Sequence, residues 1–123
     1  VKLADNENTL LDKLWPGKVS VILPCPYKEF FYLHRGTKSL AFRLPKLKWL
    51  RQMLLETGPL LAPSANWEGK KPATTIKEAR KYFGWEADFY FNKGKLNSLP
   101  STLMSLKNGK TRVLREGAVK IRL

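Results

Sequence analysis

The residues best suited to chemistry are short polar side chains and an arginine, placed where predicted strands begin or end. They are Ser64, Asn66, Ser101, Thr102 and Arg115. Hydroxyl groups, a side-chain amide and a fixed cation suit a phosphate ester together with a small zwitterion. Ligands of open α/β sheets bind at strand ends, where such groups are free to donate. The same residue types are common in turns, so ordinary turn structure is the alternative.

Several other kinds of site are excluded by the composition. The chain has one cysteine, Cys25, and one histidine, His34. A disulfide or a multi-cysteine zinc site needs more cysteines, and one histidine cannot form a ligand cluster. The sequence has neither a Walker-type phosphate loop nor a dinucleotide-binding glycine motif. We therefore predict that Cys25 and His34 have packing or surface roles.

Hydrophobic periodicity predicts helices and strands that alternate along the chain. Helices are predicted at Asn6–Trp15, at Leu47–Leu54 with Gly58 as the cap, and at Ile76–Phe83 with Thr75 as the N-cap. Strands are predicted at Val19–Leu23, Phe30–Leu33, Leu40–Leu44, Pro59–Ala62, Asp88–Phe91, Thr102–Leu106 and Thr111–Leu114. This order predicts an α/β fold of three layers, a twisted mixed sheet flanked by helices, in a single domain over residues 1–123.

The charge of the chain is strongly positive. Lys and Arg number 23 against 10 Asp and Glu, a formal net charge of +13. Such an excess attracts anions but does not identify them, so a nucleotide, a tRNA and an acidic lipid all fit as partners. The alternative is a surface that is merely solvated. No run approaches the roughly 18–20 apolar residues that cross a membrane, and no signal segment opens the chain, so a cytoplasmic protein is expected.

A succession of short motifs carries a family resemblance from about Leu10 to Val119. In order they are Trp15-Pro16-Gly17, Val19-Ser20-Val21-Ile22-Leu23, Ala41-Phe42-Arg43-Leu44-Pro45, Ala62-Pro63-Ser64-Ala65-Asn66, Pro72-Ala73-Thr74-Thr75, Pro100-Ser101-Thr102 and Val113-Leu114-Arg115-Glu116-Gly117-Ala118. Each string alone is weak, but their order and spacing are specific. The succession resembles the C-terminal part of the threonylcarbamoyl-AMP synthase domain, the YrdC-like family.

The resemblance implies a reaction and its substrates. Enzymes of that family use L-threonine, bicarbonate and ATP with Mg²⁺, and they form threonylcarbamoyl-AMP and pyrophosphate on the way to the tRNA nucleoside threonylcarbamoyladenosine. No side chain need act as a covalent nucleophile, so no catalytic residue and no metal ligand is assigned. The resemblance implies ATP contacts from Ser64, Asn66, Arg115 and Ser39, and threonine contacts from Arg43, Ala62 and Ser101.

The resemblance leaves out the beginning of the family's domain. That N-terminal segment holds a loop with threonine and tyrosine and a Lys-x-Arg-Pro string, and nothing in this sequence matches either one. We therefore expect a partial YrdC-like domain in which half of the site is absent, and ATP turnover by this chain alone stays open. An uncovered apolar sheet edge also predicts lower stability or dimerisation.

The resemblance also implies partners and leaves alternatives. The implied partners are L-threonine, bicarbonate, ATP, tRNA and the threonylcarbamoyl-transferase machinery. A second interpretation is a non-catalytic YrdC-like module that binds double-stranded RNA or tRNA through its basic surface. A third is a module of a carbamoyltransferase for hydrogenase maturation, which is disfavoured because that protein carries zinc-finger-like cysteines. The oligomeric state is not implied.

Overall fold

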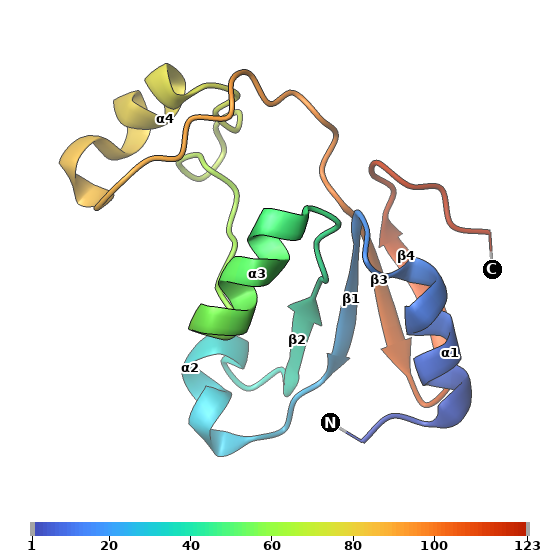
Figure 1. The fold of residues 1–123 in the computed structure, drawn as a ribbon. Helices are drawn as coiled ribbons and strands as arrows, with labels where there is room; N and C mark the ends of the chain where they lie inside the picture. Colours follow the sequence, from blue (N-terminus) through green and yellow to red (C-terminus); the bar gives the residue numbers. More distant parts are fainter. Residues whose placement is uncertain (1, 123) are drawn as a thin grey trace. The chain divides into compact units, whose positions relative to one another are not determined.

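The protein is described by a computed structural model that covers residues 2–122 and forms two compact units (Figure 1). Unit 1 combines Val1–Gly58 with Leu99–Leu123, and unit 2 is Pro59–Ser98. Unit 1 contains the β-sheet, and unit 2 contains one α-helix and its loops. The prediction of a single domain over the whole chain stays a prediction.

Unit 1 is built on a four-stranded mixed sheet in the order β2-β1-β3-β4. Its strands are β1 (Val19–Pro24), β2 (Ser39–Phe42), β3 (Thr102–Lys107) and β4 (Lys110–Arg115). β1 pairs antiparallel with β2 and parallel with β3, and β3 pairs antiparallel with β4. The mixed sheet and the α/β class predicted from the sequence are confirmed.

The hydrophobic core lies between this sheet and helix α1 (Asp5–Leu14). Strands β1 and β3 alternate between buried and half-buried residues, so every second side chain enters the core. Leu11 of α1 joins the cluster of buried side chains, which also contains Val19, Val21, Leu23, Met104 and Leu106. Trp15 closes one side, where its indole N–H donates to the Val19 carbonyl at 2.8 Å.

The opposite face of the sheet is more polar and more exposed. We call it the second face, and it carries Ser20, Ile22, Leu103, Ser105 and Lys107. The alternation of side chains along β1 and β3 assigns these residues to it. Side chains on the second face are not enclosed in the core, so a ligand can contact them.

The predicted helices form with the ends that the sequence indicates. Helix α3 spans Lys48–Thr57 and ends at Gly58, whose φ of 76° few other residues adopt readily. Helix α4 spans Ile76–Phe83 in unit 2, and its N-cap Thr75 accepts a hydrogen bond from the Glu78 N–H. Within residues 2–122, no helix combines the length and apolar character needed to cross a bilayer.

The strand predicted at Phe30–Leu33 is wrong. The chain forms a 3₁₀ helix at Lys28–Phe30 and then the short helix α2 (Phe31–His34). The two rings that suggested a strand, Phe31 and Tyr32, are exposed, so no buried face selects a period of two. The turn is instead held by local bonds, such as the Arg35 N–H to the Phe31 carbonyl at 2.7 Å.

The strands predicted at Pro59–Ala62 and Asp88–Phe91 are also wrong. Both segments lie in unit 2, and neither is assigned to a strand. Leu61 is 74% exposed and Phe89 is 70% exposed, so neither apolar run enters a core. A strand needs a hydrogen-bonded neighbour, and the four-stranded sheet of unit 1 does not include either segment.

Candidate functional site

Strand directions in unit 1 bring four polar residues together at one end of the strands. This end is different from the two outer strands of the sheet, β2 and β4. Parallel β1 and β3 begin at this edge, and antiparallel β2 and β4 end there. We call it the serine–arginine edge, and it carries Ser20, Arg43, Ser101 and Arg115. Three of these, Arg43, Ser101 and Arg115, are predicted site residues that lie far apart in the sequence.

A pair of hydroxyl groups lies at this edge. Ser101 Oγ is 2.8 Å from Ser20 Oγ, and either atom can donate. Both serines are half-buried, so solvent still reaches the pair. Two hydroxyls that share one hydrogen bond keep one hydrogen and several lone pairs for a ligand. Sequence reasoning did not select Ser20, because an alternating strand gives no sign that its hydroxyl meets a loop residue 81 positions away.

A β-bulge directs Arg115 to the same place. The register pairs Met104 with Val113 but Leu103 with Arg115, so Leu114 is an extra residue in β4. Because Leu103 belongs to the second face, its partner Arg115 is placed on that face as well. The guanidinium of Arg115 then donates through Nη2 to the Ser101 carbonyl at 2.9 Å.

A buried threonine fixes the backbone around Ser101. Thr102 is fully buried, and its Oγ1 accepts the N–H groups of Gly117 at 3.1 Å and Val119 at 3.2 Å. The hydroxyl also donates to the Val119 carbonyl, so all its contacts serve the C-terminal segment. The Ala118 N–H completes the link with a bond to the Pro100 carbonyl at 2.8 Å.

Gly117 is required by space rather than by backbone conformation. A Cβ atom there would lie 2.6 Å from the carbonyl carbon of Ser101 and would also collide with the Pro100 carbonyl. Ser101 and Gly117 therefore pack backbone to backbone, which no larger residue permits without a shift. This contact gives the glycine of the Arg-Glu-Gly string a physical role at the candidate site.

Arg43 anchors the other side of the edge. It directly follows β2, and its Nε donates to the Gly17 carbonyl at 3.0 Å. A guanidinium has five N–H donors in a planar fork, and this bond uses only one of them. The side chain is exposed, so its outer donors can meet a carboxylate.

Ser39 does not join this group. It begins β2 opposite Pro24, at the other end of the strand from Arg43. Four residues of strand separate the two by roughly 13 Å, since each residue rises about 3.3 Å. Its carbonyl accepts the Thr37 hydroxyl at 3.2 Å. An ATP contact from Ser39 stays a prediction.

Three predicted residues, Ala62, Ser64 and Asn66, belong to unit 2. Ala62 and Ser64 are exposed in an irregular loop that the Asn66 N–H closes with a bond to the Ser64 carbonyl at 3.0 Å. The same loop is tied back where the Ala73 N–H meets the Ala65 carbonyl at 2.8 Å. The ATP contacts of Ser64 and Asn66 and the threonine contact of Ala62 stay predictions.

Asn66 has an unusual hydrogen-bonding state. Its Nδ2 donates to the Trp67 carbonyl at 2.8 Å. Its Oδ1 is buried and has no hydrogen-bond partner among the described residues. Buried acceptors in folded proteins nearly always have partners, so an orphaned one marks a place that a ligand or another group completes. Of the predicted residues of unit 2, Asn66 therefore has a buried acceptor that is left for a water, a ligand or another group.

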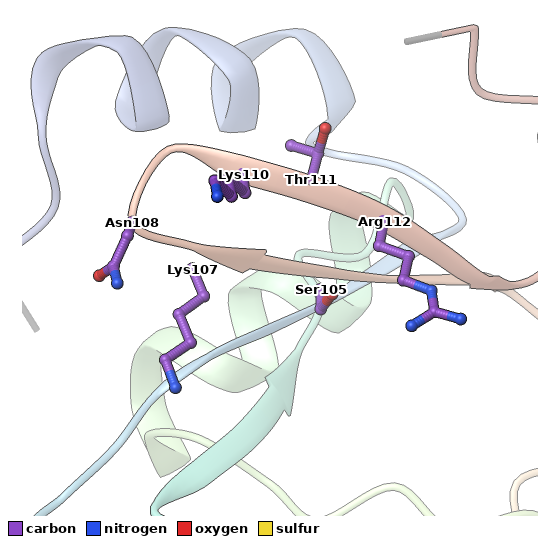
Figure 2. A pocket seen from close by; sticks show the side chains of 6 residues that line it. All are labelled: Ser105, Lys107, Asn108, Lys110, Thr111 and Arg112. Carbon is purple, nitrogen blue, oxygen red and sulfur yellow. The ribbon is translucent and has the colours of Figure 1, made fainter.

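Two of the hollows on the described surface have no predicted site residue in their lining. One, of 340 Å³, lies on the β3–β4 hairpin (Figure 2) and is lined by Ser105, Lys107, Asn108, Lys110, Thr111 and Arg112. The other, of 500 Å³, lies in unit 2 and is lined by Trp67, Lys71, Pro72, Ala73, Thr74, Glu78, Lys81 and Tyr82. The ligand contacts expected of the predicted site residues stay predictions.

Two carboxylates are held in their charged form by backbone donors. The Ala4 and Gly109 N–H groups lower the pKa of Glu7. The backbone and hydroxyl of Thr74 lower the pKa of Glu78, with a smaller contribution from the charge of Lys95. Both carboxylates serve the ends of structural elements, α1 and α4, and neither belongs to the predicted site.

Over the described residues 2–122, no three His, Cys, Asp or Glu side chains lie together as metal ligands. Mg²⁺ in nucleotide enzymes is commonly held by substrate phosphates with few protein ligands. The predicted site residues include no carboxylate, the usual protein ligand of Mg²⁺, and their guanidinium groups suit anions.

Comparison with known proteins gives the chain a family. Residues 1–117 match the model of the Sua5–YciO–YrdC family, which is described as telomere recombination. Threonylcarbamoyl-AMP synthase of Yersinia enterocolitica is 32% identical over 83 residues, which are 67% of this chain and 44% of that protein. A putative threonylcarbamoyl-AMP synthase of Mycobacterium leprae is 26% identical over 120 residues, 97% of this chain and 54% of that protein. The chain thus spans about half the length of these relatives.

Solved structures share the fold. Sua5 of P. abyssi, crystallised with L-threonine, superposes with a TM-score of 0.80 at 24% identity, over 95% of this chain and 35% of that one. YciO of E. coli superposes with a TM-score of 0.81 at 23% identity, over 96% of this chain and 59% of that one. With the family match over residues 1–117, these likenesses lead to one conclusion: the chain belongs to the Sua5–YciO–YrdC family.

Proposed function

We propose that this chain supplies the threonine- and nucleotide-binding half of a threonylcarbamoyl-AMP synthase. The reaction joins L-threonine, bicarbonate and ATP and releases pyrophosphate. The product would serve the synthesis of threonylcarbamoyladenosine in tRNA, in the cytoplasm. The names of the relatives support this activity, and the observation that carries it is the serine–arginine edge. There, Ser20, Ser101 and Arg115 form one hydrogen-bonded series beside Arg43.

The edge offers what a zwitterionic amino acid needs. The exposed guanidinium of Arg43 would bind the threonine carboxylate in a bidentate manner, because planar fork and carboxylate match in geometry. The hydroxyl pair Ser20–Ser101 would accept from, or donate to, the polar groups of the same ligand. Arg115 holds the Ser101 backbone and brings a positive charge for a phosphate.

The loop of unit 2 would supply contacts to a nucleotide. The Ser64 hydroxyl and the remaining N–H of Asn66 Nδ2 are the proposed donors to phosphate oxygens, with Ala62 lining the threonine pocket. The orphaned Oδ1 of Asn66 supports a ligand at this loop. Because that atom is an acceptor, it would take a hydrogen bond from a hydroxyl or amine of the ligand.

The chemistry needs positioning more than a reactive side chain. Threonine nitrogen and bicarbonate carbon form a carbamate with loss of water. A carbamate oxygen then bonds to the α-phosphorus of ATP as the bond to pyrophosphate breaks. Mg²⁺, bound to the triphosphate, would neutralise part of its charge. The residues of this chain would orient the two substrates and exclude alternative poses.

Pyrophosphate release tests the proposal. The chain would be incubated with Mg-ATP, with and without L-threonine and bicarbonate, beside a Ser64→Ala variant. Ser105→Ala serves as a matched control, since Ser105 lies in β3 away from the serine–arginine edge. Release that needs both co-substrates and is lost only in Ser64→Ala supports the proposal. Release that ignores threonine contradicts it.

Measuring threonine binding gives a second, independent test of the same proposal. Calorimetric titration with L-threonine, then with L-serine and L-valine, needs no turnover. Arg43→Gln should abolish binding, because the carboxylate loses its partner, while Lys46→Gln should not. Binding without pyrophosphate release would assign this chain the substrate half of a site whose other half lies elsewhere.

A nucleic-acid-binding role without catalysis is the second candidate function. The observation that favours it is the formal charge of +13 on 123 residues. Binding of RNA that is indifferent to ATP and L-threonine, together with no response to either small molecule, would select this candidate.

A further inference from the structure

The 500 Å³ hollow of unit 2 lies between the loop of residues 67–74 and helix α4. We call it the α4 hollow. One face of the helix contributes Glu78, Lys81 and Tyr82, which are spaced i, i+3 and i+4. The loop contributes Trp67 and Lys71 among others. All of the lining belongs to unit 2, so this unit forms the hollow by itself.

The two aromatic rings of the α4 hollow are held in place by their own polar groups. The Trp67 indole N–H donates to the Tyr82 carbonyl at 3.0 Å, and the Tyr82 hydroxyl donates to the Lys71 carbonyl at 2.8 Å. The two ring centroids lie 5.4 Å apart in an edge-on arrangement. Trp67 is nevertheless 55% exposed, so its ring is fixed without being covered. A fixed, exposed tryptophan loses little freedom on binding, and tryptophan is prominent among the residues that dominate protein interfaces.

The charges around these rings are of both signs. Within the described residues 2–122, no carboxylate lies at ion-pair distance from Lys71 or Lys81. The carboxylate of the lining, Glu78, accepts the Thr74 N–H at 2.7 Å and the Thr74 hydroxyl at 3.1 Å. These bonds lower the pKa of Glu78, so it stays charged. The α4 hollow therefore offers two unpaired cations, one anion and an apolar ring.

We propose that the α4 hollow is a docking site for a short segment of a protein partner in which acidic residues flank an apolar side chain. The apolar side chain would pack on the Trp67 ring beside Pro72. The flanking carboxylates would pair with Lys71 and Lys81, and a peptide N–H would donate to Glu78. The charge of +13 would draw an acidic segment to the chain from a distance.

The open form of the α4 hollow favours a peptide over a free small molecule. Trp67, Lys71, Pro72, Glu78 and Lys81 of its lining are all exposed. A site for a small molecule commonly buries about 70–90% of its ligand, which a lining as exposed as this does not do. A peptide gains affinity from contacts spread along its length, so an open groove suffices.

The mixture of charges favours a peptide over a nucleic acid. A phosphodiester backbone presents negative charge and phosphate oxygens, and Glu78 would repel them. A peptide carries N–H donors between its side chains, so it can satisfy Glu78 and the two lysines together. The aromatic ring adds an apolar contact that phosphates do not use.

Packing within unit 2 explains only part of the arrangement. The contact of Trp67 with Tyr82 fastens the loop to the helix, and this accounts for two aromatic residues at this place. A purely structural tryptophan would be covered by its neighbours. Here more than half of the Trp67 surface stays open beside two lysines that lack an acidic partner.

The inference does not rest on the proposed synthase function. None of the residues assigned to threonine or ATP lines the α4 hollow, although Trp67 directly follows Asn66. The Asn66 Nδ2 donates to the Trp67 carbonyl at 2.8 Å, and Trp67→Ala keeps that carbonyl. The variant therefore removes the ring from the hollow and leaves this bond of Asn66 available.

Selection of random peptides of about ten residues, displayed on phage, against the wild-type chain tests the docking site. The selection should enrich sequences in which an apolar residue lies between acidic ones. A fluorescein-labelled peptide of the enriched sequence is then titrated by fluorescence anisotropy. Trp67→Ala should weaken its binding at least about tenfold, because the apolar anchor is lost. Trp85→Ala removes a tryptophan that is 99% exposed outside the hollow, and it should leave the affinity unchanged.

Two matched charge variants keep the test decisive if Trp67→Ala disturbs the loop. Lys71→Gln/Lys81→Gln retains both rings and their hydrogen bonds, and it should weaken the peptide about threefold to tenfold at low salt. Lys70→Gln/Lys77→Gln removes the same charge from the same loop and the same helix, outside the hollow, and should have little effect. Circular dichroism checks that α4 remains helical in each variant.

Four results would overturn the inference. The first is a selection that enriches no acidic sequence, or one whose peptide binds Trp67→Ala equally well. Equal losses in the two lysine pairs would mean that net charge alone attracts the peptide. Displacement of the peptide by ATP or by an RNA duplex, as strong as by the unlabelled peptide, would assign the hollow to a nucleotide or a nucleic acid. Self-association of the wild-type chain that Trp67→Ala abolishes, seen by analytical ultracentrifugation, would assign it to a second copy of the chain.

Discussion

The two units of the chain differ in how they are held together. All buried apolar residues of the core cluster belong to unit 1, where α1 covers one face of the sheet. None of residues 59–98, which are all described, is buried. Unit 2 is held instead by hydrogen bonds, such as Trp67 Nε1 to the Tyr82 carbonyl at 3.0 Å, and by Arg80 over the Tyr90 ring.

This difference separates two sources of order. Burial of apolar area gives the largest favourable term in folding, about 25 cal/mol per Å². A hydrogen bond contributes only about 1 kcal/mol net, since the unfolded chain bonds to water. Unit 1 should therefore set the cooperative stability of the chain, while unit 2 should open locally at lower free energy.

The largest expected effect is a deletion in the core of unit 1. Met104 is 0% exposed, and Met104→Ala should lower the free energy of unfolding by about 2–5 kcal/mol, since it removes buried contacts and leaves a cavity. Leu61→Ala in unit 2 should stay within about 0.5 kcal/mol. Urea denaturation followed by circular dichroism measures both. Equal losses would show that unit 2 has a core of its own.

The same difference explains which elements the sequence could predict. Strand β1 has alternating side chains that enter the core, so its period of two is visible and real. The runs Pro59–Ala62 and Asp88–Phe91 are as apolar as strands but meet no sheet, and their backbone stays irregular. Helix α4 was predicted because its signals are local, from the Thr75 cap to Gly84. Local signals in the sequence can predict a helix even where no core is present. A strand forms only beside a hydrogen-bonded neighbouring strand, which the local sequence does not reveal.

The candidate site likewise contains residues that the sequence predicts and features that it does not reveal. Arg43, Ser101 and Arg115 were predicted from short motifs, and the sheet brings them to one edge. The Ser20 hydroxyl could not be predicted, because its partner is reached only by the parallel pairing of β1 with β3. The bulge that re-aims Arg115 is equally invisible in the sequence, since Leu114 and Arg115 look like ordinary strand residues.

A smaller effect is expected at the backbone contact beneath Ser101. Gly117→Ala introduces a Cβ that collides with Pro100 and Ser101, and it should cost about 1–3 kcal/mol. Because the strain falls on Ser101, threonine affinity should fall with stability. The control Gly69→Ala strains a turn of unit 2 at φ +74 without touching another atom. If both variants lower the urea midpoint equally, the units are not energetically distinct.

Ser20→Ala is expected to act on binding more than on folding. It removes one hydrogen bond from Ser101 Oγ, so threonine affinity should fall about twofold to tenfold. Ser20→Thr keeps a hydroxyl and should restore most of the affinity, and Ser105→Ala should change nothing. The experiment distinguishes a failure of the proposed function from a failure of the role given to Ser20. Wild-type protein that does not bind threonine contradicts the proposed function, whereas binding unaffected by Ser20→Ala contradicts only the role of this serine.

The smallest effect compares one carboxylate from each unit as pH falls. Folding lowers the pKa of both Glu7 and Glu78 below the usual value of 4.5, because each carboxylate accepts N–H groups. A lowered pKa in the folded state adds stability above pH 4.5, and this contribution is lost as pH falls through the folded pKa. Glu7→Gln should therefore lower the melting temperature at pH 7 and have less effect near pH 3. Glu78→Gln should instead reduce the helical signal of α4 with little change in melting temperature, since unit 2 lacks a buried core. A melting temperature that depends on Glu78 as strongly as on Glu7 would mean that α4 and the sheet unfold together.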